Sequence, residues 1–388
     1  MAKKPQQLRF TRLKLTNWRN FREADLSLEK RVFIVGPNAS GKSNLLDAIR
    51  FLSEIAPASA GGLQAAIKAR ESFSALRCLH SRQTTYVEID ARIGTDDRPE
   101  AWRYLLRINV VKSAKFPTVV QESVWKDGES VLDRKQYADS DPLEFSQTSL
   151  EQVSANKAFR ELAEFLGSCR YLHVVPQIVR DRARARSEGE DPFGGDLLRR
   201  MKDMPKKSRE PRLQRISEGL KIAVPQFGEI KLEDDAEGVP HLIASYEHWR
   251  ANASKQSEIT FSDGTLRLIG LLWSIAEKGG PLLLEEPELS LNDAVVAQLP
   301  RMFATMQKLS GRQVITTTHS SALLSDLGIG LKEVHRITVD KNGSAVTLIA
   351  NDEAIDAEVE AGMTISEAVF PRLTPTGVDA LGKLDVAR

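Results

Sequence analysis

The run G-P-N-A-S-G-K-S at residues 36–43 constrains this chain most, because it is a complete G-x-x-x-x-G-K-S loop. The apolar residues 32–35 before it are typical of a short strand. An apolar-periodic helix follows, through Leu45, Ile49 and Leu52. Strand, glycine-bounded loop and helix are the context that a phosphate-binding loop requires. This context favours nucleotide binding over the alternative, a glycine-rich turn with a chance lysine.

The spacing of the loop fits the chemistry of a polyphosphate. Its backbone N–H groups can point inward at phosphate oxygens, and the following helix presents its positive end. Lys42 is placed to reach the β- and γ-phosphates, and the Ser43 hydroxyl is placed to ligate Mg²⁺. The cofactors predicted from this stretch are therefore ATP and Mg²⁺. The candidate nucleotide-binding residues are Gly36, Pro37, Asn38, Ala39, Ser40, Gly41, Lys42, Ser43 and Asn44.

Composition sets broader limits. Of the 388 residues, 41% are hydrophobic and 28% are charged, with a net charge of +1, as expected for a globular protein. No apolar run approaches the roughly 20 residues that span a bilayer, and the first residues hold no signal-peptide core. We therefore expect a cytoplasmic protein without a membrane partner. Cys78 and Cys169 are too isolated to indicate a disulfide framework or a zinc site.

A second motif lies ahead of the loop. Residues 8–16 alternate apolar and polar side chains, which predicts an early strand, and N-W-R-N-F follows at 17–21. Together with the loop and the N-L-L-D-A-I after it, this motif resembles the start of RecF/SMC-type ABC ATPase heads and related standalone AAA-type ATPases. The resemblance implies that Arg19 lies near the base and ribose of the nucleotide. Alternatively, Trp18 and Phe21 are core residues and Arg19 is a surface charge.

The middle of the chain matches these heads only loosely. The expected elements are a helix-like segment at 61–82, strands at 86–93, 103–111 and 118–125, and a helix at 149–167. Residues 171–177 are then expected to form a strand that ends at Gln177. ABC-type ATPases carry a glutamine at such a strand end, where it contacts Mg²⁺ or the attacking water. The resemblance makes Gln177 a candidate catalytic and metal-site residue, with Gln64 and Gln83 as alternatives.

A third motif opens an apolar helix. Ser262 and Asp263, followed by Gly264, are good helix N-cap types and alone would indicate an ordinary cap. Placed before P-L-L-L-E-E-P-E at 281–288, the S-D-G-T run resembles the ABC signature. The resemblance implies that Ser262, Asp263 and Gly264 bind the γ-phosphate of ATP held by another subunit. It therefore also implies an ATP-sandwich dimer of two copies of the chain.

The run at 282–284 is expected to be a buried strand that delivers two carboxylates. By the Walker B pattern of the resembling family, Glu285 holds Mg²⁺ through water, although most members have aspartate there. Glu286 orients and deprotonates the attacking water. His319 follows another expected strand, at 313–318, and matches the switch histidine of the resembling family, which contacts the γ-phosphate. The alternatives are surface acids after a core strand, and a capping or core histidine.

Two charged segments stay open in function. Residues 180–215 hold twelve Lys or Arg against seven Asp or Glu, which indicates either a solvated face or contact with a nucleic-acid backbone. Residues 352–367 hold six acids and no Lys or Arg, typical of a solvated tail or a docking segment. No sustained heptad repeat predicts coiled-coil arms. The basic residues include Arg182, Arg184, Arg186, Arg199, Arg200, Lys206, Lys207 and Arg209.

These observations predict an α/β fold, a P-loop ABC-type ATPase head with a mainly parallel core sheet, an antiparallel β lobe and a helical signature lobe, without a coiled coil. The expected parts are an N-terminal ATPase lobe at 1–170, a helical lobe at 171–265, a C-terminal ATPase lobe at 266–350 and an acidic tail at 351–388. The resemblance implies a Mg²⁺-dependent ATP hydrolase that dimerises and couples turnover to DNA or a DNA-processing effector, in bacterial genome maintenance or phage defence. The alternative is a slow nucleotide-gated scaffold that sequesters and releases a toxin or nuclease partner.

Overall fold

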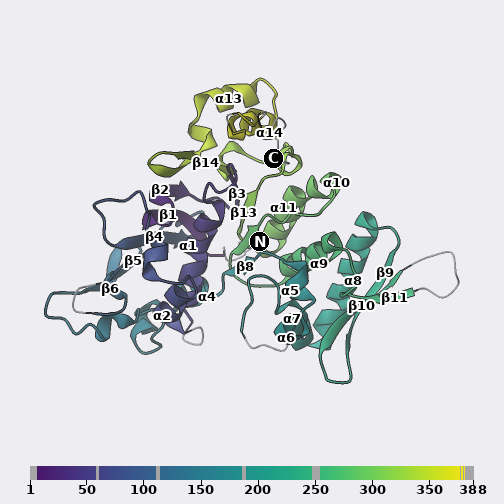
Figure 1. Ribbon diagram of the computed structural model, residues 1–388, viewed down its shortest axis with the longest axis horizontal. Helices are drawn as coiled ribbons and strands as arrows, with labels where there is room; N and C mark the ends of the chain where they lie inside the picture. Colours follow the sequence, from purple (N-terminus) through teal and green to yellow (C-terminus); the bar gives the residue numbers. More distant parts are fainter. Residues whose placement is uncertain are drawn as a thin grey trace, which may run out of the picture.

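Figure 1 shows the computed structural model of the chain, which describes residues 7–57, 61–110, 114–185, 189–246, 254–375, 377, 378 and 380. The N-terminal part, in purple and blue, lies on the left, and the teal part lies on the right. Yellow C-terminal helices lie above the strands between these two parts. No helix among the described residues is long and apolar enough to cross a lipid bilayer.

The central sheet has six strands in the order β15-β14-β3-β13-β12-β8. All neighbouring pairs run parallel except β15 with β14. This arrangement confirms the predicted mainly parallel core sheet. The strands are β3 (Arg31–Val35), β8 (Arg170–Leu172), β12 (Leu282–Glu285), β13 (Val314–Thr318), β14 (Val334–Asp340) and β15 (Gly343–Leu348).

Alternate residues of the central strands face two separate hydrophobic clusters. Ile34 of β3 lies in one cluster together with residues of α1 (Lys42–Ile55). Its neighbour Phe33 lies in the other, with residues of α9 (Asp263–Ala276) and α11 (Leu299–Ser310). Because side chains alternate along a strand, each face of the sheet meets its own cluster. Cover on both faces explains why residues 32–35 of β3 and 282–284 of β12 are continuous apolar runs.

The second sheet is antiparallel throughout, in the order β2-β1-β4-β5-β6-β7. Its apolar face belongs to the same cluster as α1. Its opposite face carries ion pairs such as Arg103 with Asp90 at 2.6 Å. The early strand and the three middle strands are confirmed, although residue 111 lies outside the described part. The strands are β1 (Arg9–Trp18), β2 (Phe21–Ser27), β4 (Val87–Gly94), β5 (Trp102–Asn109), β6 (Thr118–Lys126) and β7 (Glu129–Lys135).

The helix expected at 61–82 is wrong as a single element. The structure has α2 (Gly62–Lys68) and α3 (Phe73–Leu76) instead. Glu71 between them has a left-handed φ of 71°, which ends the first helix, and Ser72 then caps the second.

The helix predicted at 149–167 is confirmed only for its second half. Helix α4 (Arg160–Gly167) follows a short 3₁₀ segment, Ala155–Phe159. Asn156 in that segment donates its side-chain N–H to the Leu150 carbonyl at 2.8 Å. This local bond offers the backbone an alternative to a continuous helix.

The teal part contains more than the expected helices. Besides α9 it has a three-stranded antiparallel sheet in the order β11-β10-β9. Its longest helix, α8, has 18 residues, and no described helix is longer, so the described residues form no coiled-coil arm. The other elements are α5 (Pro176–Val179), α6 (Arg182–Ala185), α7 (Leu197–Asp203), α8 (Lys206–Ala223), β9 (Phe227–Asp234), β10 (Pro240–Tyr246) and β11 (Ser254–Ser257).

The acidic segment, for which the sequence left a solvated tail and a docking segment open, is folded against the rest of the protein. It forms α13 (Glu353–Glu360) and α14 (Ile365–Val369), whose apolar residues join the second hydrophobic cluster. Asp352 caps α13 and pairs with Arg336 at 2.9 Å. Residues 381–388 lie outside the described part. The remaining helices are α10 (Asp293–Val296) and α12 (Ser321–Leu324).

Candidate nucleotide site

The candidate phosphate-binding loop joins β3 to α1. Its backbone has left-handed φ angles of 58° at Ala39 and 101° at Gly41. The buried Lys42 Nζ donates to the carbonyl oxygens of Gly36 at 3.1 Å and Pro37 at 3.0 Å. Burial lowers the pKa of Lys42, while nearby carboxylates oppose that fall. No side chain caps α1, so its first N–H groups remain as donors for an anion.

Asn20 braces this loop, a role that the sequence analysis missed. Its Nδ2 donates to the Ser40 carbonyl at 2.7 Å, and its Oδ1 accepts from Asn44 Nδ2 at 2.9 Å. A Cβ on Gly41 would lie 2.1 Å from the Asn20 side chain, so this close approach requires glycine. Asn20 lies in the N-W-R-N-F motif, and this motif was the one feature of the sequence that could have pointed to its role.

Glu285 ends β12 and faces the start of α1. Ser43 Oγ donates to Glu285 Oε1 at 2.5 Å, which uses the hydroxyl proton and leaves the oxygen lone pairs for a cation. Burial raises the pKa of Glu285, although the bond from Ser43 opposes that rise. The structure thus brings together two of the three residues that the sequence analysis assigned to one magnesium site, Ser43 and Glu285.

Glu286 and His319 follow adjacent parallel strands, β12 and β13. Glu286 Oε1 lies 3.1 Å from His319 Nε2, and this hydrogen bond lowers the pKa of Glu286. The backbone of Glu286 has a φ of 43°, a strained conformation for a residue with a long side chain. Its N–H donates to the Thr317 carbonyl at 3.2 Å, which holds this conformation in place.

Glu288 holds the backbone at His319 through hydrogen bonds, and the sequence analysis did not name it as a candidate site residue. Its Oε1 accepts from Thr318 Oγ1 at 2.6 Å and from the His319 N–H at 2.9 Å. Burial raises the pKa of Glu288. Its other oxygen, Oε2, is buried and has no hydrogen-bond partner among the described residues. The E-E-P-E run contained this residue, but nothing local distinguished it from a surface acid.

The candidate signature residues begin α9. Ser262 caps the helix, since its Oγ accepts from the Thr265 N–H at 3.2 Å. A Cβ on Gly264 would lie 2.3 Å from the Ser290 carbonyl oxygen, so glycine permits the loop after β12 to pass close to the helix. Asp263 accepts from Arg180 Nη2 at 2.7 Å. The same guanidinium nitrogen donates to the Phe261 carbonyl at 2.7 Å, which fixes the signature loop.

The expected strand ending at Gln177 is wrong. Strand β8 ends at Leu172, and Gln177 lies in α5 with its Nε2 3.4 Å from Asp263 Oδ2. The residue directly after β8 is His173, whose Nδ1 donates to the Glu285 backbone carbonyl at 3.3 Å. The hydrogen bond of the Gln177 side chain therefore joins it to the candidate signature, and its role at the metal stays a prediction.

Arg19 is neither a free surface charge nor part of the apolar core. Trp18 and Phe21 beside it are fully buried, as the alternative interpretation held. Arg19 Nη2 pairs with Asp47 at 3.0 Å, and its Nη1 donates to the Ala75 carbonyl at 3.3 Å. Its contact with a nucleotide base or ribose stays a prediction.

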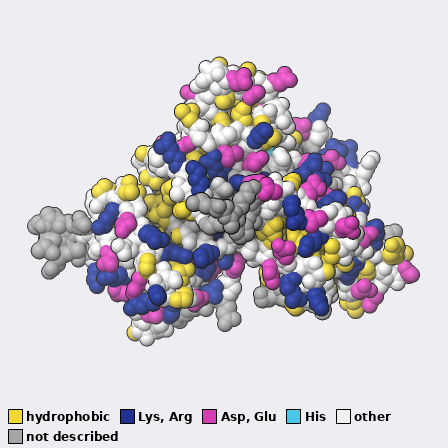
Figure 2. All heavy atoms as spheres, turned by 180° about the vertical axis from the view of Figure 1, so that it is seen from behind, with side chains coloured by type: hydrophobic (Ala, Val, Ile, Leu, Met, Phe, Trp, Pro, Cys, Tyr) yellow, Lys and Arg dark blue, Asp and Glu magenta, His cyan; other side chains and the backbone are white. Residues whose placement is uncertain are grey.

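Most of the basic segment pairs with carboxylates. Figure 2 shows Lys and Arg side chains interspersed with Asp and Glu over the coloured part of this face. Lys206 and Lys207 at the start of α8 are exposed, and Lys206 Nζ also lies 3.4 Å from Glu210 Oε1. Arg186 lies outside the described residues. The ion pairs are Arg180 with Asp263, Arg182 with Asp235, Arg184 with Asp191, Arg200 with Glu277, and Lys202 with Asp234.

The donor set fits a magnesium nucleotide. Lys42 Nζ is bonded to carbonyl groups, and no described carboxylate pairs with it, so an anion would supply its missing counter-charge. The uncapped N-terminus of α1 adds donors to the same place. Ser43 and Glu285 supply a hydroxyl and a carboxylate side by side, which are ligand types that Mg²⁺ prefers.

A family described as "AAA domain, putative AbiEii toxin, Type IV TA system" matches residues 31–325. This range covers well over half of the chain. It includes the loop, both carboxylates that end β12, and His319.

Among curated proteins, the DNA replication and repair protein RecF of Rhizobium rhizogenes (strain K84) is 35% identical over 113 residues, 27% of this chain and 28% of that protein. The RecF protein of Agrobacterium fabrum (strain C58) is 54% identical over 44 residues, 11% of this chain and 12% of that protein. The chain thus matches less than a third of the length of these relatives.

Two solved structures share the fold. The Smc head bound to the C-winged helix domain of ScpA has a TM-score of 0.55 and 17% identity, covering 87% of this chain and 96% of that chain. The Smc head with an extended coiled coil, bound to the C-terminal domain of ScpA and derived from Pyrococcus furiosus, has a TM-score of 0.52 and 16% identity, covering 91% and 100%. These similarities confirm the predicted ATPase-head fold.

Proposed function

The chain belongs to the AAA-domain family, and from this premise we propose that it is a Mg²⁺-dependent ATPase. The observation that carries the proposal is the 2.5 Å bond between Ser43 Oγ and Glu285 Oε1. It brings the phosphate-binding loop and the carboxylates of β12 to one place, although 242 residues separate them. If the loop were only a glycine-rich turn and Glu285 only a surface acid, the two would have no reason to lie in contact.

Each residue has a distinct part in the proposed reaction. Lys42 and the N–H groups that begin α1 bind the β- and γ-phosphates of ATP. When bound, Mg²⁺ neutralises charge that develops on these phosphates. Glu286, which its bond to His319 keeps ionised, orients the attacking water and accepts its proton. His319 donates to the γ-phosphate of bound ATP, which leaves the Glu286 carboxylate free for this water.

We further propose that ATP joins two copies of the chain. The N-terminus of α9, which carries Ser262 and Gly264, presents a hydroxyl and backbone N–H groups suited to a phosphate. Arg180 holds the loop before it through the Phe261 carbonyl and Asp263. A γ-phosphate bound to the loop of one copy would contact this helix end in the other copy, with two-fold symmetry.

Coupling of ATP turnover to DNA is the cellular function that we propose. Support comes from the short segments that match RecF proteins described as acting in DNA replication and repair. We infer that the protein acts in genome maintenance in the cytoplasm. The ion pairs of the basic segment give this part of the proposal little support. The exposed Lys206 and Lys207 are the candidates that we propose for contact with DNA, and Lys206 would have to leave Glu210 to make it.

A second candidate function is a nucleotide-gated scaffold that holds and releases a toxin or nuclease, including in phage defence. The family description includes the words "putative AbiEii toxin, Type IV TA system", and these words are the reason to test this candidate. A stable stoichiometric complex with the purified product of a neighbouring gene, dissolved by ATP, would distinguish the scaffold from the DNA-coupled enzyme.

Phosphate release tests the proposed enzyme directly. The purified protein should hydrolyse ATP with Mg²⁺ and stop when EDTA removes the metal. Duplex DNA should raise the rate if turnover is coupled to DNA. Hydrolysis that continues in EDTA, or no hydrolysis under any of these conditions, would contradict the proposal.

A further inference from the structure

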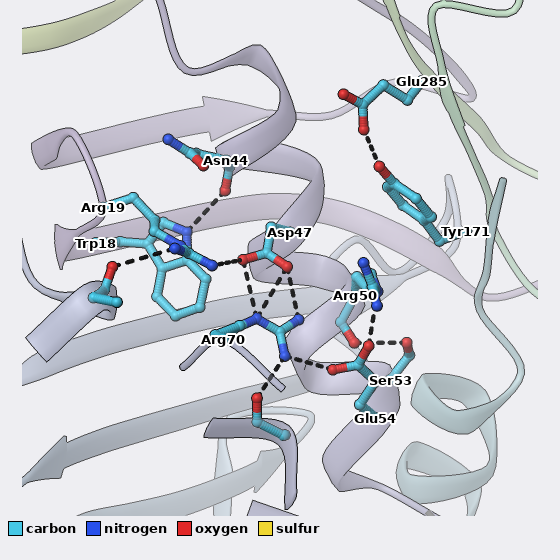
Figure 3. A network of polar contacts seen from close by, with 12 residues as sticks. Trp18, Arg19, Asn44, Asp47, Arg50, Ser53, Glu54, Arg70, Tyr171 and Glu285 are labelled. Atoms are coloured by element: carbon cyan, nitrogen blue, oxygen red, sulfur yellow. Dashed lines mark hydrogen bonds and ion pairs between the residues drawn. The ribbon is translucent and has the colours of Figure 1, made fainter. Parts of the chain in front are cut away.

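Tyr171 contacts the candidate magnesium residue Glu285 directly. It lies on β8, which runs parallel to β12 with Tyr171 opposite Leu283. Figure 3 shows its ring pointing at the Glu285 carboxylate, and its hydroxyl donates to Oε2. Because Ser43 donates to Oε1, both oxygens of this carboxylate are held, each by a different element.

The Tyr171 ring is itself held in place. The Arg50 guanidinium lies over the ring, 5.1 Å from its centroid. Arg50 Nε pairs with Glu54 Oε1 at 2.7 Å, and Glu54 Oε2 accepts from Arg70 Nη1 at 2.5 Å. The Arg70 side chain is only 4% exposed, so its end of this chain of contacts is fixed in the protein interior.

The contacts continue along α1 to the first motif. Arg70 Nη2 pairs with Asp47 at 2.7 Å, and Asp47 also accepts from Arg19 at 3.0 Å. Asp47, Arg50 and Glu54 lie three and four residues apart, which places them on one face of the helix. Figure 3 shows the polar contacts from Arg19 along α1 to Arg50 and, beside them, the bond from Tyr171 to Glu285. The contact of Arg50 with the Tyr171 ring joins these two parts.

We propose that Tyr171 is a positioning residue that fixes the Glu285 carboxylate for Mg²⁺; this inference rests on the proposed function. Glutamate has one more rotatable bond than the aspartate common at this position in the resembling family. A second donor restrains that extra freedom and keeps Oε1 on Ser43. Neighbours that orient a metal-site carboxylate commonly change metal affinity by about 10- to 100-fold when they are removed.

Tyr171→Phe tests this role because it removes one oxygen and keeps the ring under Arg50. Calorimetry with a non-hydrolysable ATP analogue, at rising Mg²⁺, measures the metal affinity without any turnover. We expect the Mg²⁺ needed for half-maximal binding to rise about tenfold or more. Affinity for the analogue in EDTA should change by less than about twofold. Tyr86→Phe is the matched control, because Arg107 lies over that ring at 4.3 Å on another face.

A double variant, Tyr171→Phe with Glu285→Asp, distinguishes a role of Tyr171 in positioning Glu285 from a general loss of structure. The shorter aspartate side chain cannot keep the contact with Tyr171, so Glu285→Asp should cost less Mg²⁺ affinity in the Tyr171→Phe background than in the wild type. Thermal unfolding of each variant checks that it folds. Unchanged Mg²⁺ affinity in Tyr171→Phe, or fully additive losses, would overturn the positioning role alone. A wild type whose analogue binding does not respond to Mg²⁺ would overturn the proposed function as well.

Discussion

Glu286 Oε1 and His319 Nε2 lie 3.1 Å apart, at the ends of two adjacent parallel strands. The pair joins the proposed base to the proposed γ-phosphate sensor before any phosphate is involved. A γ-phosphate that accepts from His319 would take this donor away from Glu286. We therefore expect phosphate binding to release the Glu286 carboxylate for the attacking water, which links recognition of ATP to its hydrolysis.

Lys42→Ala should weaken ATP binding. The change removes the one charged donor that the loop directs at the β- and γ-phosphates, so affinity should fall at least about tenfold, or about 1.4 kcal/mol. Calorimetry with ATP measures the effect. Lys308→Ala removes an exposed charge at the end of α11 and is the control. Equal ATP affinity in Lys42→Ala and the wild type would show that the loop at 36–43 does not bind the phosphates.

Glu286→Gln should accumulate as an ATP-bound dimer. Glutamine keeps the size of the side chain but cannot accept the proton from water, so bound ATP would persist between two copies. Light scattering should show a doubled mass only with ATP.

Adding Ser262→Arg to Glu286→Gln should return the mass to that of one chain, because a bulky cation would occupy the phosphate position at α9. Ser262→Thr preserves the helix cap and the hydroxyl, and it should still permit the dimer. A dimer that forms equally with Ser262→Arg would argue against the shared site.

Lys206→Glu with Lys207→Glu should weaken binding to duplex DNA. These side chains are exposed, whereas Arg200 is held between Asp196 and Glu277 and would report on folding instead. The slope of log affinity against log salt should fall by about two, one for each lost phosphate contact.

Lys308→Glu with Lys332→Glu makes the same charge change elsewhere on the surface and is the control. Equal loss in both double variants would indicate a non-specific charge effect. If the wild type does not bind duplex DNA even at low salt, the proposal that this segment contacts DNA is wrong.

His335 should make the protein less stable in acid. Burial lowers the pKa of His335 to about 4, and its Nδ1 is buried without a partner among the described residues. Between about pH 6.5 and pH 4 the unfolded chain therefore takes up a proton that the folded chain does not. Stability falls as the pH drops through this window, by about 2 kcal/mol from this group at pH 5.

Urea unfolding at pH 7 and pH 5 measures that loss. His335→Gln can keep a donor for the Ser27 carbonyl, which His335 Nε2 contacts at 2.8 Å, but it does not titrate. Its stability should change less with pH than that of the wild type. The exposed His80→Gln is the control. The same pH dependence in all three proteins would exclude His335 as the cause.

Local motifs predicted those site residues whose chemical type and spacing along the chain both match a known motif. The loop at 36–43, the carboxylates at the end of β12 and the histidine after β13 were all recognisable because each lies at the end of an expected strand. The sequence could not show that Tyr171 meets Glu285, or that Asn20 meets Ser40, because these contacts join residues far apart in the chain.

Apolar runs and charge counts did not predict the structure of two segments, 171–177 and 352–367, because tertiary contacts determine it. After Leu172 the chain leaves the central sheet, because the His173 N–H bonds to the Pro192 carbonyl at 2.8 Å instead of to β12. The charges of the acidic segment left a solvated tail and a docking segment open, yet Ile355 on α13 and Val369 on α14 are fully buried. Counting residue types could not show either outcome, because it leaves out the surface against which a segment packs.

The most direct test of the central claim compares ATP binding and hydrolysis in the same samples of wild type and Glu286→Gln. Single-turnover phosphate release with saturating Mg²⁺ and excess protein isolates the chemical step, and calorimetry gives the ATP affinity. We predict that Glu286→Gln binds ATP within about threefold of the wild type and releases phosphate at least about 100-fold more slowly. Equal phosphate release by the two proteins would contradict the account.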